Sequence, residues 1–273
     1  MTTLVFQSYR THDVPRAIEC SMASVRTWAA SRGHDYRFLD DAFFDVLPAW
    51  YREKAGDHKL LLANLARLVV ARNVLAGSHD RAIWIDADVV VFDPAAFDVV
   101  PDDGFAFCLE TWVERVGDRF EAVHRVNNAV CAFDRGNAFL DYAIWAHERL
   151  VRDRPELVQR FGTSTALLTM IFRATPLPLV HHVGLFTPAI VRELAVPGDG
   201  PAVRELALRH GHPMHAANLT YSMVGQPHNG VVATAQDYDV AVDRLIATGG
   251  AALDASRARS SDVVSSPPSR GTV

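Results

Sequence analysis

The chain has 273 residues, 49% of them hydrophobic and 22% charged, and its formal net charge is −5. A chain of this length can bury a core without disulfides or a structural metal, and its acidic balance argues against a general nucleic-acid-binding protein, which usually carries a basic face. The three cysteines are widely spaced and form no C-x-x-C pair, which predicts reduced thiols buried as small core residues.

The N-terminus has neither the basic segment nor the long apolar segment of a secretory signal. No stretch reaches the ~20 apolar residues that are needed to cross a bilayer. We therefore expect a cytoplasmic protein. Peripheral attachment to a membrane or to a polysaccharide-assembly complex stays open.

The first forty residues predict a β–α–β unit. The apolar run 4–6 is expected to form a strand, and residues 7–13 a polar turn. Residues 17–31 have the pattern of an amphipathic helix, with Pro15 at its first position. A second strand is expected at 36–39. This order is typical of an α/β fold with a largely parallel sheet.

The segment 40–56 has no clear period, whereas residues 58–76 predict a helix because leucines recur at helical spacing and Gly77 follows. The apolar residues 82–85 predict a buried strand. That strand runs directly into Asp86-Ala87-Asp88, and the apolar run continues beyond them.

The rest of the chain gives shorter signals. Strands are expected at 105–109, 129–133 and 177–183, helices at 138–151, 166–172 and 237–248, an interrupted helical region at 189–211, and a loop at 215–218. The segment 251–273 is rich in Ser, Pro and Arg and predicts a disordered tail. We expect one catalytic domain over residues 1–250.

Asp86 and Asp88 are predicted to lie at the carboxyl end of a buried strand, where ligands bind in open α/β sheets. Two carboxylates so close together repel each other unless a cation lies between them. Oxygen ligands suit Mg²⁺ or Mn²⁺, and such ions also bind substrate phosphates. The pattern therefore predicts a divalent ion on a nucleotide diphosphate. The alternative is that the two aspartates merely end the strand, because a bare D-x-D is a weak pattern.

The surroundings of this pair resemble the core of the GT-A glycosyltransferases, and most of all the galactosyltransferase-like and capsular-polysaccharide branches. The resemblance is carried by Lys59, Asn64, Arg67 and Leu68 on the helix and by the run 83–92. It implies a Rossmann-like α/β domain with a central, mostly parallel sheet flanked by helices. It also implies transfer of a hexosyl group from a nucleotide sugar, UDP before GDP, to an acceptor hydroxyl in polysaccharide or glycoconjugate synthesis, with retention of configuration favoured.

The same resemblance implies the binding residues of the donor. Arg67 and Lys59 would reach the nucleotide or the donor sugar; the alternative for both is a solvated helix face. The other residues expected to bind the donor are Gln7, Ser8, Tyr9 and Arg10 at the base and ribose, Ala87 between the two aspartates, and Asn127 and Asn128 at the sugar hydroxyls. An ordinary β–α turn is the alternative at 7–10, and a turn before a strand at the asparagines.

Two further residues complete the expected site. His215 resembles the downstream histidine that supplies the third metal ligand in many GT-A enzymes. Glu110, at the end of the next strand, is expected either to act as a general base on the acceptor hydroxyl or to pair with a nearby cation. The segment 162–169 resembles the start of the acceptor-side helix, but it lacks the acidic residue that family members often carry there.

Two other functions fit parts of the pattern. A haloacid-dehalogenase-like phosphatase also has an apolar strand followed by D-x-D, but that strand normally comes first in its domain. Its lysine is also missing, because no lysine follows Asp103. The second alternative is a non-catalytic nucleotide-sugar-binding protein, against which the intact Asp86, Asp88 and Arg67 argue.

Overall fold

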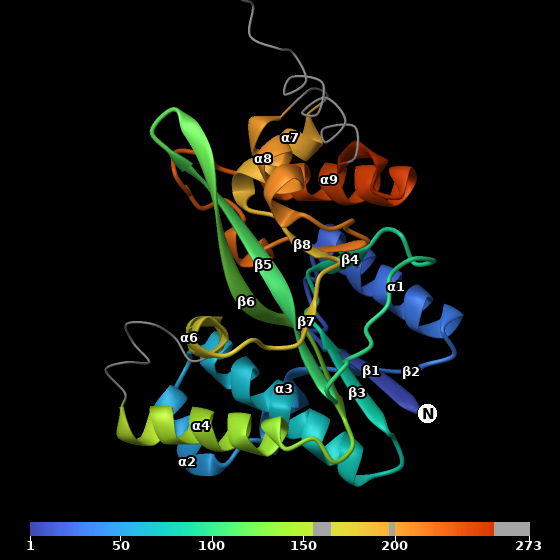
Figure 1. Ribbon diagram of the computed structural model, residues 1–273, viewed down its shortest axis with the longest axis vertical. Helices are drawn as coiled ribbons and strands as arrows, with labels where there is room; N and C mark the ends of the chain where they lie inside the picture. The colour runs from blue at the N-terminus through green and yellow to red at the C-terminus, as the bar shows by residue number, and fades with distance from the viewer. Residues whose placement is uncertain (155–164, 197–199, 254–273) are drawn as a thin grey trace, which may run out of the picture.

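The computed structural model describes residues 1–154, 165–196 and 200–253, and their main sheet has the strand order β2-β1-β3-β6-β5-β7 (Figure 1). β1 pairs in parallel with β2 and β3, and β5 with β7, whereas β6 is antiparallel to both of its neighbours. Five strands thus run one way, and the expected α/β fold with a mostly parallel sheet is confirmed. The strands are β1 (Thr3–Ser8), β2 (Asp35–Leu39), β3 (Arg81–Ile85), β5 (Phe105–Val116), β6 (Arg119–Asp134) and β7 (Leu179–Val180).

Helices cover both faces of this sheet because alternate strand residues are apolar on each side. On one face, Phe6, Trp84 and Phe133 pack in a single core under a layer of helices. That layer consists of η1 (Asp41–Val46), α2 (Ala49–Ala55), α3 (Lys59–Ala76), α4 (Phe139–Asp153) and α6 (Thr165–Ala174). On the opposite face, Val5 and Ile83 pack against Trp28 of α1 (Arg16–Ser31). β3 is therefore buried on both faces, which explains its continuous apolar sequence.

A second, small sheet has the order β4-β9-β8 and consists of β4 (Val89–Val91), β9 (Ala216–Asn218) and β8 (Val183–Leu185). β4 is antiparallel to β9, and β8 is parallel to it. Three helices pack against this sheet in a core of their own: α7 (Pro188–Ala195), α8 (Pro201–His210) and α9 (Ala235–Thr248). Figure 1 shows this unit above the main sheet, beside the long β5–β6 hairpin.

The structure differs from the expected elements in several places. The apolar run after Asp88 is a separate strand of the small sheet, the expected loop 215–218 contains β9, and the single strand expected at 177–183 is split between the two sheets. The unassigned segment 40–56 forms η1 and α2. The described fold also extends past residue 250, because Leu253 is only 3% exposed and packs in the core of the small sheet. The expected loop residues 162–164 and 197–199 and the tail 254–273 lie outside the described residues.

None of the helices within the described ranges is long and apolar enough to cross a membrane. Cys108 and Cys131 are buried and Cys20 is half-buried, and all three are free thiols. Burial raises the pKa of the Cys108 thiol to about 12, so this group stays protonated at neutral pH. The expectation that the cysteines are small core residues is thus confirmed for Cys108 and Cys131.

Candidate functional site

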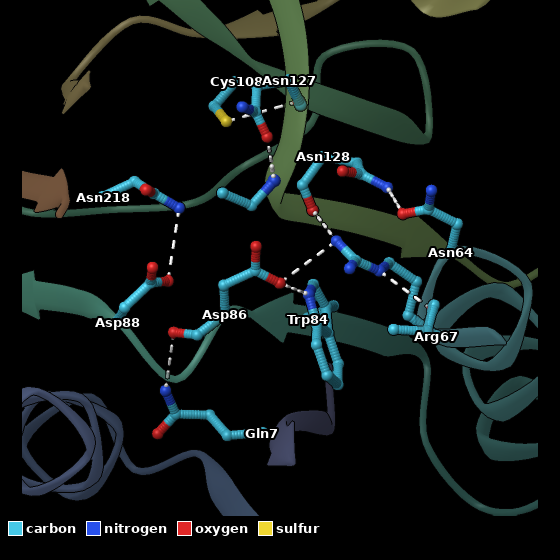
Figure 2. A network of polar contacts seen from close by, with 12 residues as sticks. Gln7, Asn64, Arg67, Trp84, Asp86, Asp88, Cys108, Asn127, Asn128 and Asn218 are labelled. Atoms are coloured by element: carbon cyan, nitrogen blue, oxygen red, sulfur yellow. Dashed lines mark hydrogen bonds and ion pairs between the residues drawn. The ribbon is translucent and has the colours of Figure 1, made fainter. Parts of the chain in front are cut away.

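Asp86 and Asp88 lie in the connection between the two sheets (Figure 2). β3 ends at Ile85, and the small sheet begins at Val89. The backbone N–H of Asp86 donates to the carbonyl of Ala129 in β6 at 2.7 Å, and the N–H of Leu219 donates to the carbonyl of Asp88 at 3.0 Å. One aspartate is therefore fixed to the main sheet and the other to the small sheet.

The Asp86 carboxylate is held by two buried groups. Its Oδ1 lies 2.6 Å from the indole Nε1 of Trp84 and 3.1 Å from a guanidinium nitrogen of Arg67. The Arg67 side chain is 4% exposed and that of Asp86 is 25% exposed, so the ion pair is largely shielded from water. Burial raises the pKa of Asp86, while the charge of Arg67 and the hydrogen bond from Trp84 oppose this rise.

Arg67 itself is fixed by several contacts along α3 and the sheet. It donates to the carbonyl of Asn128 at 2.8 Å and to that of Ala63, one turn earlier, at 3.2 Å. Its guanidinium also lies over the Trp84 ring, 4.9 Å from the centroid. Arg67 thus acts on the site through the orientation of Asp86.

Asp88 is held from the other side. Its Oδ2 accepts a hydrogen bond from the backbone N–H of Tyr221 at 2.9 Å, and the Nδ2 of Asn218 lies 3.4 Å from its Oδ1. The pKa of Asp88 is raised to about 6, first by burial and then by the negative charge of Asp86. The charge of Asp86 therefore makes Asp88 harder to ionise, and a cation bound between the two carboxylates would remove this repulsion.

The turn that presents Tyr221 to Asp88 is strained. Thr220 has φ of 49°, which is unusual for a β-branched residue. Three hydrogen bonds fix this backbone: the Thr220 N–H donates to Asn218 Oδ1 at 2.8 Å, its hydroxyl donates to the carbonyl of Phe186 at 2.6 Å, and its carbonyl accepts from the Tyr238 hydroxyl at 3.3 Å. Such strain persists only where the surroundings hold it in place, often at functional sites.

The donor set fits an ion that is shared with a substrate. Among the described residues, no group of three or more His, Cys, Asp or Glu side chains could hold a metal ion. Mg²⁺ is commonly bound by only one or two carboxylates, together with waters and substrate phosphates. Asp86 and Asp88 match that kind of site, in which phosphate oxygens complete the coordination.

His215 is not brought to the two aspartates, contrary to expectation. Its Nδ1 lies 3.0 Å from Asp93 Oδ2, and its carbonyl accepts from Phe92 and Asp93. In the register of the small sheet Asn218 faces Val89, so His215 lies three residues away, roughly 10 Å along the strand. The physical reason is the unexpected strand β9, which places Asn218 beside Asp88 and directs His215 towards Asp93.

The expected nucleoside residues lie where β1 ends. Gln7 is buried; its Nε2 donates to the Asp86 carbonyl at 3.1 Å, and its Oε1 accepts from the Tyr36 hydroxyl at 3.1 Å. Ser8 ends the strand, and Tyr9 and Arg10 follow it. Beyond Gln7, a hollow of about 560 Å³ opens between the β1–α1 loop, α1 and β2; its lining includes Arg10, Met22, Arg26, Tyr36 and Phe38. Gln7 therefore connects this hollow to Asp86.

The two asparagines of β6 have different surroundings. The Nδ2 of Asn128 donates to Asn64 Oδ1 on α3 at 3.3 Å, whereas the Nδ2 of Asn127 donates to Glu110 Oε2 at 2.6 Å. Asn127 also accepts from the N–H of Ala129 at 2.7 Å. Glu110 is 3% exposed, and burial raises its pKa, while Asn127 and Arg125 oppose this rise. Glu110 thus joins the site through Asn127 and Ala129.

Lys59 is exposed at the first residue of α3. It precedes Arg67 by eight residues, about 12 Å along the helix axis. The structure therefore brings Arg67 to Asp86 and leaves Lys59 at the far end of the same helix. Ala87 lies between the two aspartates and packs against Ile18 and Met22 of α1.

Three contributors to the site were not predicted from the sequence: Trp84 as a donor to Asp86, and Asn218 and Tyr221 as partners of Asp88. Trp84 is the second residue before Asp86, so the period of the strand places both side chains on the same side of the sheet. The two alanines before Asn218 could have indicated a short buried strand with a polar end. Tyr221 contributes only its backbone N–H, which leaves no signal in the residue type.

Comparison with protein-family models finds no match to this chain, and comparison with curated protein sequences finds none either. Among solved structures, the chain is similar to a glycosyltransferase involved in the glycosylation of the major capsid of PBCV-1. The identity is 9%, the match covers 89% of this chain and 100% of that chain, and the TM-score is 0.44. A likeness this distant assigns no activity to the chain.

Proposed function

We propose that this protein is a GT-A glycosyltransferase that moves a sugar from a nucleotide diphosphate sugar to an acceptor hydroxyl. The observation that carries the proposal is the pair Asp86 and Asp88 at the carboxyl end of a central strand, with the pKa of Asp88 raised to about 6 by burial and by its neighbour. Two carboxylates so arranged suit Mg²⁺ or Mn²⁺ shared with a diphosphate. When bound, this ion would neutralise charge on the departing diphosphate.

The hollow beside β1 supports a nucleoside at that place. Its lining combines the aromatic rings of Tyr36 and Phe38 with the cations Arg10 and Arg26, a combination suited to a base and ribose. Gln7 connects the hollow to the carbonyl of Asp86, so a base there and a diphosphate at the aspartates could belong to one molecule. The preference for UDP over GDP rests on the sequence resemblance.

In this mechanism each residue acts on the geometry of the site. Arg67 and Trp84 hold Oδ1 of Asp86, and the N–H of Tyr221 holds Oδ2 of Asp88, so both carboxylates are oriented before a ligand arrives. Such preorganised charge is commonly the largest catalytic contribution. Glu110 is fixed by Asn127, which favours a positioning role over that of a mobile base and agrees with the expected retention of configuration.

The phosphatase alternative is disfavoured by the sequence. Phosphatases of that kind need a lysine after the strand that carries the nucleophile, and the chain has no lysine after Lys59. Assay of a general phosphatase substrate such as p-nitrophenyl phosphate would detect this activity directly.

The test is thermal unfolding with UDP- and GDP-sugars, with and without Mn²⁺, followed by measurement of UDP or GDP release. A donor at ~100 times its Kd stabilises the folded state by about 2.7 kcal/mol, which raises Tm by about 5–10 °C in a domain of this size. We expect this rise only with Mn²⁺, and we expect Asp88→Ala to abolish it.

The matched control is Asp102→Ala, which removes an exposed carboxylate in the turn before β5. This variant should keep the full metal-dependent rise in Tm. A donor-induced rise that needs no metal, or that survives in Asp88→Ala, would contradict the proposal. Binding without release of nucleotide in the presence of any acceptor would favour the non-catalytic alternative.

A further inference from the structure

The β5–β6 hairpin presents a row of polar and aromatic side chains on one face. Glu110 is opposite Arg125, and Trp112 is opposite Val123, so Glu110, Trp112 and Arg125 share that face. The other face carries Thr111, whose hydroxyl lies 3.0 Å from Nδ1 of His210 on α8, and Val113, which is buried in the core of the small sheet. α8 therefore contacts the hairpin on this other face.

A continuous series of contacts joins this face to the candidate metal site. Asp86 N–H donates to Ala129, Ala129 N–H donates to Asn127, and Asn127 Nδ2 donates to Glu110. The series continues from Glu110 to a guanidinium nitrogen of Arg125 at 3.7 Å. Arg125 in turn lies over the Trp112 ring, 5.4 Å from its centroid. The row thus begins beside the reacting centre and leads outward along the hairpin.

At the outer end, a loop from the small-sheet unit reaches the hairpin. The rings of His228 and Trp112 meet edge to face, with centroids 5.3 Å apart and planes at 87°. Both residues are half-buried, and 38% of the Arg125 side chain is exposed. A guanidinium has five N–H donors, so Arg125 keeps donors for a ligand after its contact with Glu110.

The chemistry of this row favours a hydroxylated ligand with an apolar face. An indole ring provides a flat apolar surface with a polar edge, and Glu110, Arg125 and His228 provide acceptors and donors at its border. A nearly buried carboxylate such as Glu110 is costly to desolvate, and an apolar pair in its place is often no less stable. A contribution to folding stability therefore does not explain why these polar and aromatic residues are present on the hairpin.

We propose that Glu110, Trp112, Arg125 and His228 form the acceptor subsite, and that the acceptor is a carbohydrate whose ring stacks on Trp112. This inference rests on the proposed function, and it names the substrate class that the second half of the site takes. Arg125, whose side chain is 38% exposed, would bind a hydroxyl of the acceptor, and Glu110 would hold Arg125 in place. Trp112 would bind the same sugar ring or the one beyond it.

The test uses a panel of methyl glycosides as probes and follows the tryptophan indole N–H signals of the full chain by NMR. Trp112 is assigned from Trp112→Phe. We expect at least one glycoside to shift the Trp112 signal, and Trp112→Leu to weaken that binding about tenfold, which corresponds to about 1.4 kcal/mol of binding free energy. The control is Trp145→Leu on α4, which is 56% exposed and should leave glycoside binding unchanged.

A second variant separates binding of the acceptor from binding of the donor. Arg125→Gln keeps a side chain of similar reach but removes the charge, and it should weaken glycoside binding while the Mn²⁺-dependent nucleotide binding stays near wild type. If no glycoside shifts the Trp112 signal although nucleotide binding is intact, the acceptor subsite is wrong and the proposed function stands. If glycosides bind at Trp112 but no nucleotide binds, the proposed function fails and the carbohydrate site remains.

Discussion

Asp88 is a residue of the candidate metal site whose ionisation depends on its surroundings. Burial and the charge of Asp86 raise its pKa to about 6, whereas an aspartate in an unfolded chain titrates near ~3.9. The folded state therefore binds the proton more tightly, so this group's contribution to stability falls as pH rises between these two values. A bound divalent ion would reverse this trend, because its ligands must be deprotonated.

We expect metal-free Asp88→Asn to be more stable than wild type near neutral pH, and the difference to disappear near about pH 4, where Asp88 is protonated. Urea unfolding in EDTA across this range measures both proteins. His210 contributes in the opposite direction, because burial lowers its pKa to about 4, but this contribution is common to both and cancels in the comparison. A wild type that is more stable than Asp88→Asn at neutral pH would contradict the prediction.

Arg67 provides a second test at the scale of single residues. Arg67→Met leaves Asp86 without its cation, and loss of one partner from a buried pair costs about 3–5 kcal/mol. We expect the lower end, because a quarter of the Asp86 side chain is exposed. The variant should also bind Mn²⁺ more weakly at neutral pH, because Arg67 lowers the pKa of Asp86. Arg72→Met, exposed on the same helix, should change stability by no more than about 0.5 kcal/mol.

At the scale of elements, the sequence predicts those helices and strands that have a regular apolar pattern and a clear end. The helix 58–76 and strand 82–85 have strong apolar patterns, and the structure has both. Arg67 and Asp86 were therefore placed correctly, one on the helix and one after the strand. The outer half of the β5–β6 hairpin was missed because its residues are largely exposed and many are charged, so it has no apolar pattern. β9 was missed because its pairing is with distant segments, and with it the position of Asn218 beside Asp88.

The prediction for His215 was wrong because strand β9 was not predicted. A histidine in a presumed loop is free to approach the metal, but the same residue at the start of a paired strand has a fixed register. Three small residues, Ala216, Ala217 and Asn218, are too short a run for a strand to be identified from propensity alone. The pairing with β4 decides their structure, and that pairing is non-local.

The first turn of helix α9 contains a capping motif beside a residue that contacts the candidate site. Thr234 and Asp237 form a reciprocal capping box at its first turn, and Tyr238 in the next position hydrogen-bonds the carbonyl of Thr220. Thr234→Ala should lower the free energy of unfolding by about 1 kcal/mol. Thr248→Ala, at the exposed last residue of α9, is the control and should change it by less than about 0.5 kcal/mol. Equal losses in both variants would show that the cap does not act as proposed.

At the scale of the whole molecule, the described fold continues further along the chain than the composition indicated. Gly250 has φ of 84°, and a Cβ there would meet the Phe92 ring at 2.6 Å, so the chain turns closely over Phe92 before Leu253 enters the core. We expect a chain that ends at residue 253 to unfold at the same urea concentration as the full protein. A chain that ends at 250 should lose about 1.5–3 kcal/mol, the value of one buried leucine. Equal stability of the two truncated chains would contradict this boundary.

The connection of the two sheets through Asp86-Ala87-Asp88 has a kinetic consequence. The N–H of Asp86 is protected by the main sheet and the N–H of Leu219 by its bond to Asp88, so their exchange with deuterium reports two separate local openings. A nucleotide and metal ion that join both carboxylates would make the two openings one event. We expect these two amides to take up deuterium at different rates in the free protein, and at a common, slower rate in the complex.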